Sequence, residues 1–301
     1  MQLLDLTLAL ERVPADPVLV MALDGWTDAG EGGTGAADVL RASFDPTPVG
    51  RFRSDGLYDY RDRRPQLEID RGILGEPQWP ELVVEYLEPP SGPPLLLVTG
   101  AEPDLSWQTV GADLTELAEA VGATRYVGLG SVPGPIPHTR PVQLISTASD
   151  PALLERFDRP HEQVVVPASC QVTLEAILRD AGLTTLGLWV RIPHYVAGAY
   201  PEASKVLLER LSSHLGTPVD LGELEDATAE NRAKLDVAAA SSEEVTDHIR
   251  QLERLYDAEQ EAERLADGGG FGGRAFTEEQ VPSGDELAAE IERFLKGGSG
   301  D

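Results

Sequence analysis

Short apolar segments alternate with amphipathic segments over the first two hundred or so residues, and this alternation constrains the fold most. The run Val18–Leu23 is apolar on both faces, as expected for a buried parallel strand. The segment Trp107–Ala120 carries apolar residues at helical spacing and is followed by Gly122, a typical helix terminator. Strands that alternate with helices of about 10 to 15 residues imply βαβ crossovers. Further strands are expected at residues 81–87, 95–99, 125–129, 143–147, 163–166 and 185–192, and further helices at 28–42, 170–178 and 201–215.

The sequence therefore predicts an α/β protein, a three-layer sandwich around a mostly parallel or mixed central sheet of about seven or eight strands. After Gly222 the composition becomes rich in Ala, Glu, Arg and Leu, which favours one long helix or a helical hairpin broken near Ser241–Ser242. The expected organisation is a core domain (1–219), an acidic helical segment (220–267), a Gly-rich linker (268–282), and a C-terminal helix with its tail (283–301).

The formal net charge is −28, and residues 220–301 hold 22 acidic residues against 8 basic ones. Such a surface disfavours nucleic acids and anionic membranes, because both are bound largely through Lys and Arg. It favours protein partners with a basic surface, or cationic ligands, although acidity also serves solubility alone. The single Cys170 excludes an internal disulfide, and the N-terminal segment has no basic region like that of a signal peptide. We therefore expect a cytoplasmic protein that does not bind membranes.

Two loops that follow predicted strands carry candidate chemistry. The first contains Asp24, Trp26 and Asp28, and the second contains Glu102 and Trp107. Loops at the carboxyl ends of strands in an open α/β sheet commonly line ligand sites. Glu102 is a candidate general base if its pKa is raised. The competing structural interpretation is that Asp28 caps a helix and that Glu102 lies near the positive end of the next helix.

A third loop, Gly128–Pro141, is rich in Pro and Gly and presents Ser131, His138 and Arg140 in a stiff frame. Its roles remain open between a ligand clamp, an anion site at Arg140 and a subunit contact. His194 follows another predicted strand, and we expect that it approaches His138. We will call the segment from Gly128 to Pro141 the proline loop.

No complete catalytic motif is present, so the catalytic residues are unknown. Cys170 lies at the start of a predicted helix, where a thiol pKa can be lowered, but its neighbours do not form a nucleophile elbow. The histidines and acids match no compact metal-ligand spacing. We expect no metal and no cofactor.

Four segments together resemble the PAC2 family, named after a eukaryotic proteasome assembly chaperone, and its actinobacterial branch in particular. They are Met21–Gly30, Gly128–Pro141, Ile192–Tyr195 and Pro282–Leu287. The resemblance implies an α/β fold of phosphorylase/hydrolase-like architecture and a homotrimer. It implies no catalytic residue.

Three functional hypotheses follow. The first is a non-catalytic interaction or assembly protein that is chaperone-like, with a link to the proteasome as one option. The second is a small-molecule hydrolase or a nucleoside phosphorylase-like enzyme, which requires at least three of Asp24, Glu102, His138 and Arg140 in one pocket. The third is a self-assembling scaffold whose proline loop and terminal helices form a closed ring.

Overall fold

In the computed structural model, residues 1–154 and 163–267 are described. One mixed sheet has the strand order β1-β3-β6-β7-β2-β8-β10-β9. Its strands are β1 (Leu4–Leu6), β2 (Val18–Asp24), β3 (Thr47–Phe52), β6 (Leu82–Leu87), β7 (Leu95–Ala101), β8 (Arg125–Gly134), β9 (Leu144–Ala148) and β10 (Thr184–Pro193). The four central strands β7, β2, β8 and β10 are parallel, and the outer pairings are antiparallel. The predicted α/β class with a mixed sheet is confirmed.

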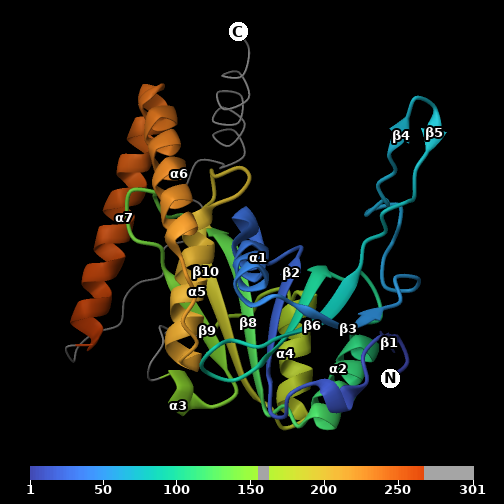
Figure 1. Cartoon of the computed structure of the whole chain (residues 1–301). Helices are drawn as coiled ribbons and strands as arrows, with labels where there is room; N and C mark the ends of the chain where they lie inside the picture. The colour runs from blue at the N-terminus through green and yellow to red at the C-terminus, as the bar shows by residue number, and fades with distance from the viewer. Residues whose placement is uncertain (155–162, 268–301) are drawn as a thin grey trace.

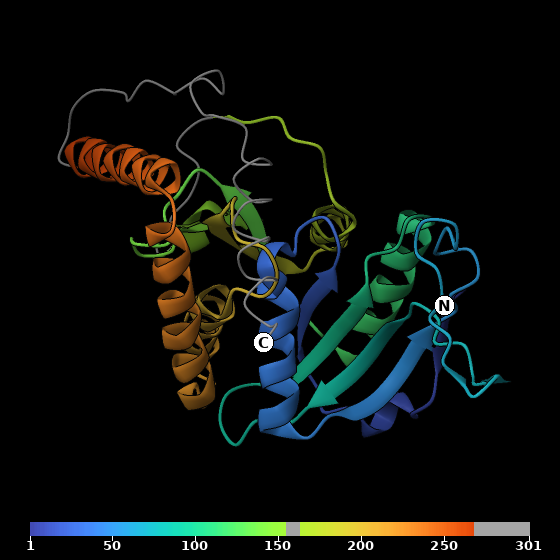
Figure 2. The ribbon, with the colours of Figure 1, turned by 90° about the horizontal axis from the view of Figure 1, so that it is seen from above.

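Helices cover both faces of the sheet (Figures 1 and 2). On one side lie α1 (Gly32–Phe44) and α5 (Pro201–Leu215), and on the other lie α2 (Trp107–Val121) and α4 (Cys170–Asp180). Side chains of β2 alternate between these two cores. Val18 and Val20 face the first, whereas Leu19 and Met21 face the second. This double burial is the reason that the strand is apolar throughout.

A helical hairpin follows the core, as one of the two sequence alternatives proposed. It consists of α6 (Gly222–Ala240) and α7 (Glu243–Asp267), separated at Ser241–Ser242. Leu235 of α6 joins the core beneath α5, while Ile249 and Leu252 of α7 form a small apolar cluster with Tyr195 and Ala238. Figure 1 shows the hairpin, in orange and red, at the end of the sheet where β10 and β9 lie.

An arm at the other end of the sheet was not predicted. It is a two-stranded hairpin between β3 and β6, made of β4 (Ile69–Asp70) and β5 (Ile73–Leu74). Arg71 and Gly72 form its turn with φ values of 48° and 87°, as a two-residue hairpin turn requires. Figure 1 shows the arm projecting away from the body.

Several element boundaries differ from the prediction. The strand expected at 163–166 is wrong, since these residues pair with no strand in the described chain. β8 continues beyond residue 129 into the proline loop, because β10 pairs with it as far as Gly134. The remaining short elements are η1 (Leu10–Arg12), η2 (Ala29–Glu31) and α3 (Pro151–Leu154). The predicted linker and last helix lie outside the described residues.

Candidate functional site

The loops that follow the central strands meet at one edge of the sheet. The backbone N–H of Glu102 donates to the carbonyl of Asp24, at 2.9 Å, and that of Ser131 donates to the carbonyl of Thr27, at 2.8 Å. The N–H of His194 reaches the carbonyl of Gly134, at 3.1 Å. All the candidate loops are therefore neighbours. Their polar side chains nevertheless divide into two groups, one around Glu102 and one around His138.

Glu102 joins two loops by accepting backbone hydrogen bonds. Its Oε2 accepts from the N–H of Trp26, at 2.6 Å, and its Oε1 from the N–H of Cys170, at 2.7 Å. Gly25 is required here, because a Cβ at this position would lie 2.2 Å from Oε2 of Glu102. Each carboxylate oxygen thus accepts one backbone hydrogen bond. Glu102 thus holds the carboxyl-edge loops together, with both of its oxygens already engaged by backbone donors.

The other candidates of this group are also engaged or turned outward. Asp24 forms an ion pair with Arg63, Nη1 to Oδ2 2.9 Å. Trp107 donates its indole N–H to the carbonyl of Pro103, at 2.5 Å. The side chain of Trp26 is 72% exposed while its backbone is held by Glu102. An exposed Trp on a fixed backbone is suited to protein contact, since Trp is enriched at interface hot spots.

Asp28 is the helix cap that the sequence suggested, but its geometry differs. Its Oδ1 accepts from the backbone N–H groups of Gly33 and Thr34, at 2.7 and 3.1 Å. Glu31 adopts a left-handed φ of 56° and its side chain makes no capping hydrogen bond. The helix therefore begins only at Gly32. Burial raises the pKa of Asp28, against the opposing effect of these hydrogen bonds.

Ser131 is buried between β8 and the start of α1. Its hydroxyl donates to the carbonyl of Ala29, at 2.6 Å. A Cβ on Gly32 would lie 2.5 Å from the Ser131 hydroxyl, and one on Gly33 would lie 2.6 Å from the carbonyl oxygen of Leu129. The glycine run thus lets α1 approach β8 closely. Ser131 acts as part of this packing and not as an exposed nucleophile.

Cys170 and Gln171 begin α4 beneath the same loops. Cys170 is fully buried, and burial raises its thiol pKa well above the usual range, so the thiolate is disfavoured. Gln171 was not singled out from the sequence. Its Nε2 donates to the carbonyl of Leu129, at 3.0 Å, and its Oε1 accepts from the N–H of Leu23, at 3.2 Å. It thus connects β2 and β8 just beyond the pair of Met21 and Gly128, the last residue pair of their parallel ladder.

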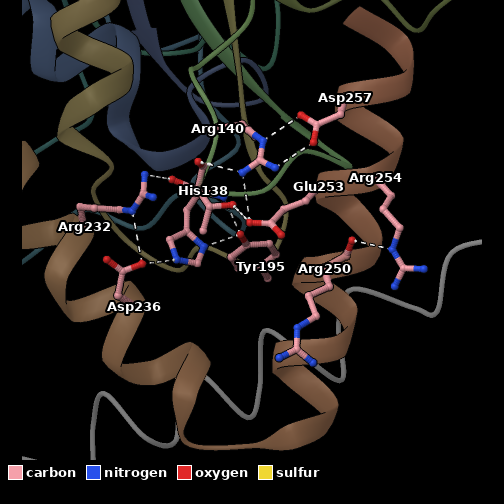
Figure 3. Close-up of polar contacts among 10 residues, drawn as sticks. His138, Arg140, Tyr195, Arg232, Asp236, Arg250, Glu253, Arg254 and Asp257 are labelled. Carbon is pink, nitrogen blue, oxygen red and sulfur yellow. Dashed lines mark hydrogen bonds and ion pairs between the residues drawn. The ribbon is translucent and has the colours of Figure 1, made fainter. Parts of the chain in front are cut away.

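The second group binds the proline loop to the helical hairpin (Figure 3). The backbone N–H of His138 donates to the Tyr195 hydroxyl, at 2.7 Å, and that hydroxyl lies 2.7 Å from His138 Nδ1. His138 Nε2 lies 3.2 Å from Asp236 of α6. Arg232 of α6 donates to the His138 carbonyl. Burial, reinforced by the charge of Arg232, lowers the pKa of His138, which favours a neutral ring that accepts from Tyr195 and donates to Asp236.

The next two residues of the proline loop reach α7. Thr139 donates to Oε1 of Glu253, at 2.6 Å, and Arg140 Nη1 lies 3.2 Å from the same oxygen. Arg140 also binds both oxygens of Asp257, each at 2.8 Å. The hydrogen bond from Arg140 lowers the pKa of Asp257. The anion site at Arg140, one of the three roles left open for this loop, is thus occupied by two carboxylates of α7 in the same chain. We call this set of contacts between the proline loop, Tyr195 and the hairpin the latch.

His194 and His138 both contact the ring of Tyr195. The ring centroids of His138 and Tyr195 are 5.8 Å apart, and those of His194 and Tyr195 are 5.5 Å apart. His194 also contacts His248 of α7, with centroids 5.6 Å apart. Tyr195, Asp236, Glu253 and His248 were not singled out from the sequence. The sequence indicated only that the C-terminal helices are acidic. It did not show which of their residues face the proline loop, which lies about a hundred residues earlier in the chain.

The hollows described on the surface do not bring the catalytic candidates together. Two surface hollows are described. One, of about 640 Å³, opens on β3 and β6, and the other, of about 420 Å³, is lined by Arg140 but not by Asp24, Glu102 or His138. Among the described residues, no group of three or more His, Cys, Asp or Glu side chains is placed to hold a metal ion. Likewise, no helix in that part of the chain is both long and apolar enough to cross a membrane.

The model of the PAC2 family matches residues 22–239. A Mycobacterium tuberculosis protein of unknown function is 34% identical, with 88% of this chain and 92% of that chain covered and a TM-score of 0.81. A proteasome-assembly chaperone homologue, also from M. tuberculosis, is 27% identical, with 77% and 99% covered and a TM-score of 0.73. A PAC2 family protein from Streptomyces avermitilis is 29% identical, with 77% and 99% covered and a TM-score of 0.69. No curated protein matches.

Proposed function

This chain belongs to the PAC2 family, and from that premise we propose that it is a non-catalytic protein-interaction or assembly protein of the cytoplasm. In this proposal the hairpin α6–α7 is a rigid acidic platform for a partner with a basic surface. The chain itself assembles into a homotrimer. A chaperone-like role is supported by the M. tuberculosis relative described as a proteasome-assembly chaperone homologue.

The latch is the observation that carries the proposal. The two most unusual polar residues of the proline loop, His138 and Arg140, are directed at the helical hairpin and pair with its acids. Their contacts fix α6 and α7 against the core at several points. A platform fixed in this way loses little conformational entropy when it binds, which favours affinity. Its exposed acids, including Glu223, Glu225 and Glu244, give it the charge that attracts a basic surface.

The enzyme alternative finds less support. It requires at least three of Asp24, Glu102, His138 and Arg140 to share a pocket, whereas each of them is bound to another group of this chain. Asp24 pairs with Arg63, and Glu102 with two backbone N–H groups. His138 and Arg140 pair with acids of the hairpin. A general base or an anion-binding Arg needs a free group facing its substrate.

Comparative affinity capture tests the proposal. The wild-type protein is compared with a variant in which Glu223, Glu225 and Glu244 are all replaced by Gln. The matched control neutralises three exposed acids elsewhere, Glu11, Glu88 and Glu119. We expect the wild type and the control to capture the same basic protein at about 0.01 M salt, and to lose it at about 1 M salt.

The hairpin variant should bind that protein about tenfold more weakly or worse. Circular dichroism confirms that all three proteins keep the same helicity. If the hairpin variant captures the same protein as the wild type with unchanged affinity, the acidic platform is not the binding surface.

A further inference from the structure

The arm between β3 and β6 is a hairpin that, within the described chain, packs only at its base, where the ring of Trp79 contacts Tyr60. Its ladder includes reciprocal backbone hydrogen bonds between Gln66 and Gln78, at 3.0 and 2.7 Å. Every residue from Gln66 to Trp79 is nevertheless exposed. A two-stranded hairpin by itself is at best marginally stable in water. An arm of this kind needs a second surface to keep its shape.

The arm carries apolar side chains suited to such a surface. The most exposed are Ile69, Ile73 and Leu74, at 61%, 73% and 67%. Ile69 and Leu74 are cross-strand partners, and Leu67 shares their face by the two-residue period of a strand. Both outer edges of the hairpin lack a strand partner in the described chain. The arm therefore offers an apolar face together with free backbone donors and acceptors.

A second unpartnered element lies before α4. The segment Gln163–Ala168 contains three successive valines, which is why a strand is expected there. In the described chain it forms no ladder, and Val164, Val165 and Val166 are 62%, 93% and 67% exposed. Figure 2 shows this segment, the yellow-green coil leading to α4, well apart from the cyan arm. Each element thus offers the unpaired strand backbone that the other lacks. The two lie too far apart to pair within one chain.

Charge favours a second copy of this chain as the occupant. The chain carries a net charge of −28, so two copies repel each other over most of their surfaces. The arm from Arg64 to Trp79 holds two basic and three acidic residues, and Gln163–Ala168 holds no charged residue. These are places where two copies can meet without bringing like charges together.

We propose that the arm of one copy forms a β-sheet with the segment Gln163–Ala168 of the next copy. The contact is an example of β-augmentation, in which the backbone hydrogen bonds give affinity and the alternate side chains give register. Two different surfaces are joined, so the interface is heterologous and closes into a ring when the rotation per copy allows it. The proposal rests on the homo-oligomer part of the proposed function, and it adds the two elements that join.

Sedimentation velocity of the full-length protein tests the interface. We expect an oligomer for the wild type, and a monomer for both Ile69→Ser/Leu74→Ser and Val164→Ser/Val166→Ser. Val237→Ser is the control, because Val237 is 61% exposed on α6 and should leave the oligomer intact. All of these side chains are exposed, so far-UV circular dichroism should be unchanged. Higher salt should preserve or strengthen the oligomer by screening repulsion, whereas it weakens binding of a basic partner.

Cross-linking provides a second readout that does not depend on dissociation. Differently tagged Ile73→Cys and Val165→Cys proteins are mixed, unfolded, refolded together and treated with a short bismaleimide. We expect cross-links between the two kinds of chain, and none when either variant is treated alone. Cys170 is fully buried and should not react.

Each contrary outcome points to a different failure. If the wild type is an oligomer and both double variants stay oligomeric, the proposed interface is wrong while the homotrimer proposal stands. Cross-links between Ile73→Cys chains alone indicate an arm-to-arm contact and also overturn the interface. A wild type that stays monomeric overturns both the interface and the homotrimer. It does not bear on the proposal that α6 and α7 bind a basic partner.

Discussion

Arg140 of the proline loop and Asp257 of α7 form a two-point ion pair, with Nε to Oδ1 and Nη2 to Oδ2 both at 2.8 Å. These residues are 117 positions apart in the sequence. Parallel hydrogen bonds of this kind fix orientation as well as distance, since the guanidinium is planar. With His138 and Thr139 beside it, Arg140 sets the position of the helical hairpin on the core.

Replacing Arg140 by Ala should loosen α7 without unfolding the core. The variant loses the contacts to both Asp257 and Glu253, so the hairpin opens more often than the rest of the protein. Hydrogen–deuterium exchange should show faster exchange along α7 and unchanged exchange in β2 and β8. Arg179→Ala is a suitable control, because Arg179 forms an exposed ion pair with its neighbour Asp180. Equal exchange in α7 of the wild type and the Arg140 variant would show that the latch does not hold the helix.

Replacing Glu102 by Ala should destabilise the protein by about 2 kcal/mol, because two backbone N–H groups lose their acceptor. Urea unfolding followed by circular dichroism measures the change. Glu88→Ala, at an exposed position, should change the stability by less than about 0.5 kcal/mol. An undiminished stability of the Glu102 variant would argue that this carboxylate is free for another role.

Glu175 of α4 should make the fold less stable as the pH rises through neutrality. Its carboxyl group is buried, accepts a hydrogen bond from Thr147 at 3.0 Å, and burial raises its pKa from 4.5 to about 7. For an acid with a raised pKa, the stabilisation is complete below about pH 4.5 and is lost as the pH rises to about 7. The free energy of unfolding of the neutral variant Glu175→Gln should therefore rise by about 3 kcal/mol relative to that of the wild type across this pH window. A constant difference between the two proteins at all pH values would contradict the assignment.

His248 should have the opposite dependence on pH. Burial and the nearby His194 lower its pKa, so its contribution to stability is present above about pH 6.5 and is lost as the pH falls below that value. His194 is the titratable ring that contacts it, and neither ring nitrogen of His248 has a hydrogen-bond partner within the described chain. His248→Phe should melt higher than the wild type near pH 5.5, with a smaller difference at pH 7.5. A lower melting temperature of the variant at both pH values would indicate that the imidazole is needed.

The local pattern of apolar residues predicted the central elements well, because a strand that is buried on both faces is apolar throughout. The apolar run Val18–Leu23 and the helix ending before Gly122 both lie where the sequence places them. The pattern failed where one element depends on a distant one. Val164–Val166 has strand composition but pairs with no strand in the described chain. The segments on either side of the turn at Arg71–Gly72 are too short to show an alternation of apolar and polar residues that would predict strands.

The same limit applies to the candidate site. Asp28 was identified as a cap because its partners Gly33 and Thr34 are local. The partners of Arg140 were not identified, since helical spacing alone does not say which loop faces Glu253 and Asp257. Glu175 was missed although it shares a helical face with Gln171, four residues earlier. Two polar residues at that spacing beside the buried Leu174 are a usable signal for polar groups on the core face of a helix.

Zero-length cross-linking tests the central claim most directly. A carbodiimide joins carboxylates to lysine amines, and this chain has only three lysines, so internal products are few. After treatment of a cell extract containing the tagged protein, mass spectrometry locates the joined residues. We expect carboxylates of α6 and α7, such as Glu225 and Glu244, to be joined to lysines of one partner. Partner cross-links confined to other parts of the chain, with α6 and α7 unmodified, would contradict it.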